Sequence, residues 1–156
     1  MTKKVVLGVV LALIFTIPMN SVEKEILNNE IQPMVVTQFL EKAKKNNNWK
    51  TAFVTGRNEQ IVFMNISHMT NPDNEIGMED HPFDQVILIV EGRGKAILEG
   101  QASNVNEGDM IFIPQGTRHN VINLDQAKGL KLISFYSETD IPRDTVYNKK
   151  ADAPKD

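Results

Sequence analysis

Short runs of apolar and β-branched residues, separated by turn residues, fill most of the chain after Trp49. Eight such runs lie at residues 50–55, 60–66, 84–91, 95–98, 103–105, 110–113, 118–123 and 130–136. Glycine, proline, asparagine and aspartate mark the turns between them. No long helical pattern separates these runs, which argues against a parallel α/β sheet. The pattern predicts an all-β domain of seven or eight strands, arranged as a sandwich or a barrel.

One short helix is predicted before the first strand. Val36, Phe39, Leu40 and Ala43 fall at positions i, i+3, i+4 and i+7, which places them on one face of a helix. The three asparagines at residues 46–48 end it, because asparagine favours turns and helix ends over helix interiors.

The run at residues 84–91 is apolar on both of its alternating faces apart from Gln85. A strand of this kind is buried on both sides. A barrel packed against a second subunit would bury it in this way, so we expect a homodimer.

The first 20 residues differ from the rest of the chain. Two lysines precede an apolar run at residues 5–17, which is shorter than the roughly 20 residues that span a bilayer. This pattern is typical of a secretory signal. Cleavage between Met19 and Val22 would export the protein to the periplasm or the medium and leave no membrane span. An uncleaved N-terminal membrane anchor is the alternative.

The remaining chain has the length of one ordinary domain. We expect residues 21–48 to hold a lead-in and the short helix, and residues 49–137 to form the barrel. The tail at residues 138–156 is polar, charged and contains proline. We therefore expect this tail to be extended or loose.

Composition narrows the possible functions. The formal net charge is −3, which argues against a nucleic-acid binder because that function needs a basic surface. The chain contains no cysteine, so disulfides, thiolate metal ligands and cysteine nucleophiles are excluded. Three histidines, His68, His81 and His119, are the imidazole donors available to a metal site.

Two segments carry side chains that suit a metal ion. Glu79 and His81 are two residues apart, so on an extended chain they point to the same face, and Gln85 keeps that parity. His119 follows a Pro-x-Gly turn that directs the chain into a new strand. If that strand lies opposite, two imidazoles, one carboxylate and one amide oxygen meet. Such a set suits one divalent ion, Fe, Mn, Ni or Zn.

The second of these segments resembles a motif of the cupin family. Its pattern, G-x5-P-x-G-x2-H-x3-N, is matched at Gly108, Pro114, Gly116, His119 and Asn123. The resemblance implies a jelly-roll β-barrel with a metal site, and it includes a group of small bacterial cupins described as mannose-6-phosphate-isomerase-like. It brings no known substrate, because fold does not fix function.

The first cupin motif, G-x5-H-x-H-x3-E-x6-G, is matched only in part. His81 and Gly92 are kept, whereas Asp73 replaces the opening glycine. Glu79 stands where the first histidine is usual, and Gln85 where the glutamate is usual. The total charge of the ligand set is therefore unchanged, while its geometry and softness differ.

Three functions stay open at this point. The first is a metal-dependent enzyme, an isomerase or epimerase or a dioxygenase, that acts on a small oxygenated molecule. No separate catalytic base is evident; Glu79 would serve if it does not bind the metal, and Tyr136 and Arg118 are weaker candidates. The second is a non-catalytic module that binds a small ligand or a metal. The third is a barrel that only dimerises.

Overall fold

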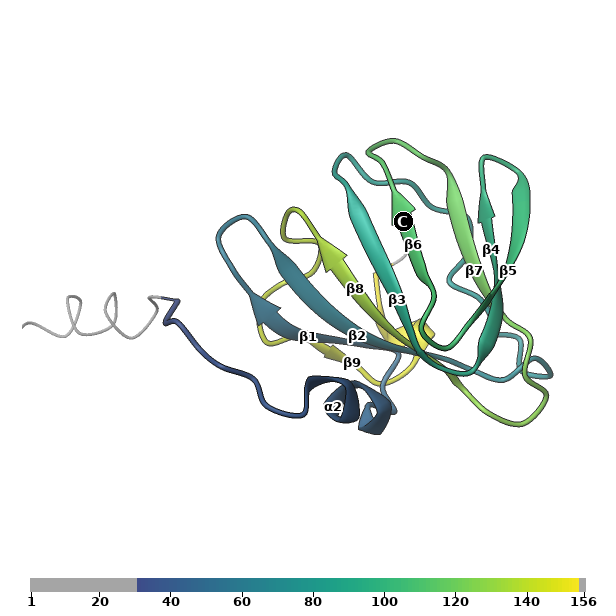
Figure 1. Ribbon diagram of the computed structural model, residues 1–156, viewed down its shortest axis with the longest axis horizontal. Helices are drawn as coiled ribbons and strands as arrows, with labels where there is room; N and C mark the ends of the chain where they lie inside the picture. Colours follow the sequence, from purple (N-terminus) through teal and green to yellow (C-terminus); the bar gives the residue numbers. More distant parts are fainter. Residues whose placement is uncertain (1–30, 155–156) are drawn as a thin grey trace, which may run out of the picture. The chain divides into compact units, whose positions relative to one another are not determined.

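The computed structural model describes residues 31–154 (Figure 1). The chain divides into two units, residues 1–32 and residues 33–156, and every element named below belongs to the second. The predicted signal at residues 1–20 lies outside the described residues. No helix within the described part of the chain is long and apolar enough to cross a bilayer.

The fold is built almost entirely of antiparallel strands, as the sequence predicted (Figure 1). The strands are β1 (Lys50–Thr55), β2 (Gln60–Ile66), β3 (Gln85–Glu91), β4 (Arg93–Leu98), β5 (Gln101–Asn106), β6 (Met110–Ile113), β7 (His119–Asn123), β8 (Leu130–Tyr136) and β9 (Val146–Tyr147). A six-stranded sheet has the order β6-β3-β8-β2-β1-β9, and a three-stranded sheet has the order β5-β4-β7. The predicted jelly-roll architecture is confirmed.

The main core is a single hydrophobic cluster formed by both sheets. Alternate residues of each strand supply it, because successive side chains of a strand point to opposite faces. Its strand members include Val62, Met64, Ile66, Ile87, Ile89, Ala96, Val105, Ile111, Ile113, Val121, Leu130, Leu132 and Tyr136. Residues from both sheets therefore form the interior that surrounds the candidate site.

A second apolar cluster covers the other face of the six-stranded sheet. Helix α2 (Phe39–Lys45) contributes Ala43 and Phe39, which pack with Phe63 and Val90. Helix α2 thus covers part of the outer face of β3. The predicted helical stripe was wrong in two members: Val36 precedes the helix, which begins only at Phe39, and Leu40 is 49% exposed.

Lys131 on β8 forms hydrogen bonds to the turn that follows α2. Its ammonium group donates hydrogen bonds to the carbonyl oxygen of Asn46 and to Oδ1 of Asn47, the latter at 2.9 Å. Burial lowers the pKa of Lys131, opposed by the charge of Glu91. The buried ammonium group of Lys131 is thus hydrogen-bonded to neutral oxygens of the two residues that follow the helix.

The C-terminal tail, expected to be extended or loose, is extended in part at β9 (Val146–Tyr147) and is not loose. Within that tail β9 pairs with β1, and a 3-10 helix, η1 (Lys150–Asp152), follows it. Ile141 is buried in the main core, and Lys150 donates a hydrogen bond to the carbonyl oxygen of Glu75 at 2.8 Å. These contacts give a polar segment fixed positions against the barrel.

Gln60 at the start of β2 holds the beginning of this segment. Its buried amide nitrogen donates to Ile141 O at 2.7 Å and to Thr55 Oγ1 at 2.9 Å. Its amide oxygen accepts from the backbone N–H groups of Asp140 and Ile141 at 3.0 and 3.1 Å. One side chain therefore satisfies three backbone groups at the point where the tail leaves the barrel.

We predict that Gln60→Met lowers the free energy of unfolding by about 2–4 kcal/mol, because backbone groups of Asp140 and Ile141 lose their buried partner, at ~1–3 kcal/mol for each group left unsatisfied. Urea denaturation would measure it. Gln101→Met, at an exposed position of β5, is the matched control and should leave stability nearly unchanged. Equal losses in the two variants would contradict this role of Gln60.

Candidate metal centre

Two segments of the chain meet at a short backbone bridge. The N–H of Glu79 donates to His119 O at 3.0 Å, and the N–H of His119 donates to Glu79 O at 2.8 Å. Glu75 and Ile122 form a second isolated bridge nearby. The two bridges differ by one residue in register, and Gly77, with φ of 104°, lies between them in a conformation that favours glycine.

This extra residue changes which side chains face inward. On an unbroken extended chain, residues three apart point to opposite faces. Here Ile76 is buried in the core, and the carboxylate of Glu79 nevertheless reaches the buried His119. A bulge of this kind re-aims a side chain toward a site. The local irregularity therefore delivers Glu79 to the interior.

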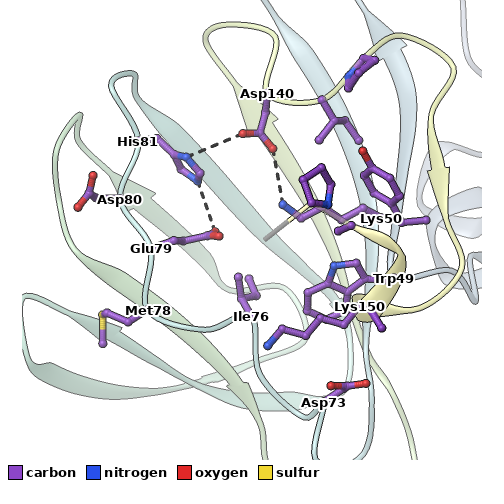
Figure 2. A pocket seen from close by; sticks show the side chains of 16 residues that line it. Trp49, Lys50, Asp73, Ile76, Met78, Glu79, Asp80, His81, Asp140 and Lys150 are labelled. Atoms are coloured by element: carbon purple, nitrogen blue, oxygen red, sulfur yellow. Dashed lines mark ion pairs between the residues drawn. The ribbon is translucent and has the colours of Figure 1, made fainter. Parts of the chain in front are cut away.

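Three side chains converge at this point. Oε1 of Glu79 lies 3.4 Å from Nε2 of His81 and 3.5 Å from Nε2 of His119. One ligand atom from each of the three residues lies within 4.8 Å of the others. Figure 2 shows the carboxylate of Glu79 facing His81. The structure thus brings together three of the four predicted metal ligands in one cluster.

Each imidazole has a polar group near its Nδ1 atom, on the side of the ring away from Glu79. Nδ1 of His119 lies 2.8 Å from the carbonyl oxygen of Thr117, which can only accept, so Nδ1 carries the proton and leaves Nε2 facing Glu79. The ring of His81 stacks on Phe83, with ring centroids 5.0 Å apart, and its Nδ1 lies 3.9 Å from Asp140. The two Nε2 atoms are therefore aimed at the same place.

Gln85, the fourth predicted ligand, is buried at the start of β3. Its amide nitrogen donates to Ser134 Oγ at 3.2 Å, which leaves its oxygen without a hydrogen-bond partner. Among residues 31–154, six buried side-chain polar atoms have no such partner: Asn65 Oδ1, Glu79 Oε1, His81 Nε2, Gln85 Oε1, His119 Nε2 and Tyr136 OH. Buried polar atoms are normally paired, and four of these six belong to the predicted metal ligands.

The electrostatics of the cluster favour a negative charge on Glu79 and a positive charge on His119. Burial of Glu79 favours its neutral form, yet the imidazoles of His119 and His81 outweigh this effect and hold the pKa of Glu79 well below its usual value. Burial also opposes a charge on His119, but Glu79 and the Thr117 carbonyl raise its pKa on balance. The negative charge of Glu79, which favours a proton on His119, would favour a divalent cation at the same place.

A cavity of about 800 Å³ opens onto the cluster. Glu79 and His81 lie at one end of it, and Trp49, Ile76 and Lys150 form part of its walls (Figure 2). Its size is within the range of small-molecule sites, roughly 300–1,000 Å³. The C-terminal segment supplies several of its lining residues: Asp140, Ile141, Pro142, Tyr147, Lys150, Ala151, Ala153 and Pro154.

The other candidates are placed differently. His68 lies outside the cluster, with its Nδ1 2.8 Å from Thr70 Oγ1. Asp80 and Asp84 are exposed. Asp140 was missed by sequence reasoning, because it lies in a segment with no periodic pattern and reaches the site only through contacts made far away in the sequence.

The remaining motif positions shape the barrel. The amide nitrogen of Asn123 donates to three carbonyl oxygens, those of Ile66, Ser67 and Lys128, at 2.8–3.1 Å. Gly116 has φ of 74° in the turn before β7. Of the five matched residues in the second motif, His119 is the one whose side chain belongs to the cluster.

Comparison with known proteins agrees with this architecture. The sequence profile of the cupin domain matches residues 68–136. The protein BH2720 from Bacillus halodurans is 33% identical, and its crystal structure superposes with a TM-score of 0.71 over 78% of this chain and 92% of that chain. The chain belongs to the cupin family. The narrower mannose-6-phosphate-isomerase-like grouping stays a prediction.

Two further relatives of this cupin are uncharacterized proteins. YrkC of Bacillus subtilis (strain 168) is 37% identical over 70% of this chain, and the match spans 60% of the length of YrkC. L612 of Acanthamoeba polyphaga mimivirus is 32% identical over 74% of this chain and 72% of its own length. Neither relative brings an activity to the site.

We predict that Glu79→Gln lowers the pKa of His119 in the metal-free cupin, because it removes the carboxylate that favours the charged imidazole. An NMR titration of the imidazole resonances would measure the shift. Glu138→Gln, which neutralises an exposed carboxylate, should leave the titration of His119 unchanged. The same His119 pKa in the wild type and in Glu79→Gln would contradict the proposed charge pairing.

Proposed function

We propose that this cupin binds one divalent metal ion through Glu79, His81, Gln85 and His119, and that the ion acts on a small oxygenated molecule in the adjoining cavity. The observation that carries the proposal is the set of four buried ligand atoms on these residues that have no hydrogen-bond partner. One ligand atom from each of Glu79, His81 and His119 already lies within 4.8 Å of the other two.

The donor types fit a transition metal better than calcium or magnesium. Two imidazole nitrogens and one carboxylate suit Fe(II), Mn(II), Ni(II) or Zn(II), whereas calcium and magnesium prefer oxygen donors alone. One carboxylate and three neutral donors would leave a net positive charge at the ion. That charge would attract an oxygen-bearing, electron-rich ligand.

The surrounding residues suggest how such a ligand is bound. When bound, the metal supplies Lewis acidity or a position for O2. Tyr136 keeps its proton at neutral pH, because burial raises its pKa far above the ordinary value. Its ring lies edge-on to His81, with centroids 5.6 Å apart, and its hydroxyl group is suited to donate a hydrogen bond rather than to act as a base.

Two reaction classes are compatible with this site, isomerisation or epimerisation, and dioxygenation. Isomerisation or epimerisation is the less favoured class, because it needs a base that abstracts a proton. Glu79, with its lowered pKa, is a poor base, and Tyr136 stays protonated. The same observation favours the alternative that the site binds its ligand without turnover. Oxygen consumption in the presence of small oxygenated substrates would support dioxygenation, whereas ligand retention without turnover would support binding alone.

We predict about one divalent metal per chain in the purified protein, and its loss in the double variant His81→Ala, His119→Ala, because both imidazole donors are removed. Elemental analysis would measure the metal content. His68→Ala is the matched control, since His68 lies outside the cluster. Equal metal content in the wild type and the double variant would disprove the site.

Gln85→Glu tests the fourth ligand separately. We predict tighter metal binding, because the change adds a negative charge where an amide oxygen now has no partner. The same change should destabilise the metal-free protein, because two buried carboxylates would then lie in one site. Calorimetric titration and urea denaturation would measure the two effects. Gln101→Glu on the exposed strand β5 should produce neither of them, and unchanged metal affinity in Gln85→Glu would exclude Gln85 as a ligand.

Export and dimerisation stay predictions from the sequence. Size-exclusion chromatography with light scattering would test the homodimer. Detection of the mature N-terminus outside the cytoplasm would test export.

A further inference from the structure

We propose that Asp140 is a positioning residue for His81, and that the segment after the barrel supplies it so that the metal site is assembled from barrel and tail together. The inference rests on the proposed metal-binding function. It concerns a residue outside the cupin domain match, which ends at residue 136.

Asp140 lies between His81 and a lysine. One carboxylate oxygen is 3.9 Å from Nδ1 of His81, and the other is 3.6 Å from Nζ of Lys50 (Figure 2). All three side chains are largely buried, at 12% exposure for His81 and Lys50 and 16% for Asp140. The carboxylate thus faces the imidazole from the side opposite to Glu79, which contacts Nε2.

The backbone fixes the carboxylate in this place. The N–H of Asp140 and both polar backbone groups of Ile141 are bonded to the buried amide of Gln60. The side chain of Ile141 is packed in the main core beside them. Asp140 therefore projects from an anchored point, although it belongs to a segment that makes few regular backbone pairs.

Metal-binding imidazoles need a partner for the second ring nitrogen, which sets the tautomer and the ring orientation. His119 has such a partner in the Thr117 carbonyl oxygen. Asp140 occupies the corresponding position behind His81, and stacking on Phe83 restrains the plane of the ring. Each of the two imidazoles thus has a separate group that turns its Nε2 toward Glu79.

The 3.9 Å separation is longer than a direct hydrogen bond. Asp140 therefore acts by charge: it favours the orientation in which Nδ1 carries a proton and faces the carboxylate. Lys50 balances the charge of Asp140, so the pair adds no net charge to the site. The role proposed is orientation, and neither proton transfer nor direct contact with the metal is required.

Cobalt(II) is the probe for the test, because its visible absorption reports ligand geometry as well as binding. Asp140→Asn should lower Co(II) affinity by about 10–100-fold, the usual effect of losing such a partner, and should change the Co(II) spectrum. Asp140→Glu keeps the carboxylate and should retain most of the affinity. Asp80→Asn removes an equal charge from another residue lining the cavity and should have a much smaller effect.

Lys50→Met separates positioning from a purely structural ion pair. It breaks the pair with Asp140 but leaves the carboxylate behind His81, so Co(II) affinity should be unchanged or higher. If Lys50→Met loses as much affinity as Asp140→Asn, the pair is structural and the inference is overturned. Circular dichroism of each metal-free variant would establish that the fold is intact.

The outcomes distinguish the inference from the proposed function. If the wild type does not bind Co(II), both are overturned. If the wild type binds but Asp140→Asn matches Asp80→Asn in affinity and spectrum, the metal site stands and the role of Asp140 is excluded. A loss confined to Asp140→Asn, with an altered spectrum, supports the inference.

Discussion

The reciprocal backbone hydrogen bonds between Glu79 and His119 hold the candidate site together. They join a long loop to β7, and the extra residue accommodated near Gly77 turns the carboxylate inward. This bridge brings Glu79 and His119, which are forty residues apart in the sequence, to the same buried place. The 3.5 Å approach of the Glu79 carboxylate to Nε2 of His119 follows from it.

Much of the barrel could be predicted from the sequence, because its information is local. The predicted runs 50–55, 60–66, 110–113 and 130–136 coincide with strands, since alternating apolar residues and turn residues determine such elements directly. The convergence of Glu79, His81 and His119 was also predictable, although for Glu79 the simple parity argument succeeded without foreseeing the bulge that makes it possible.

The tail could not be predicted, because its order depends on partners far away in the sequence. Residues 138–154 have no periodic pattern, yet Gln60 and the core hold Asp140 and Ile141 in place. The start of α2 was also missed, since the helix begins at Phe39 after the left-handed Gln38, which leaves Val36 outside it. In both cases tertiary contacts or a single residue's conformation outweigh local preference.

The central claim is that the four buried ligand atoms hold one metal ion. A crystal structure of the protein grown with Mn(II) or Co(II), with anomalous diffraction measured at the metal edge, tests it most directly. The account predicts one strong peak bounded by Glu79 Oε1, His81 Nε2, Gln85 Oε1 and His119 Nε2. A well-ordered site with no peak there, or a peak bound by other residues, would contradict it.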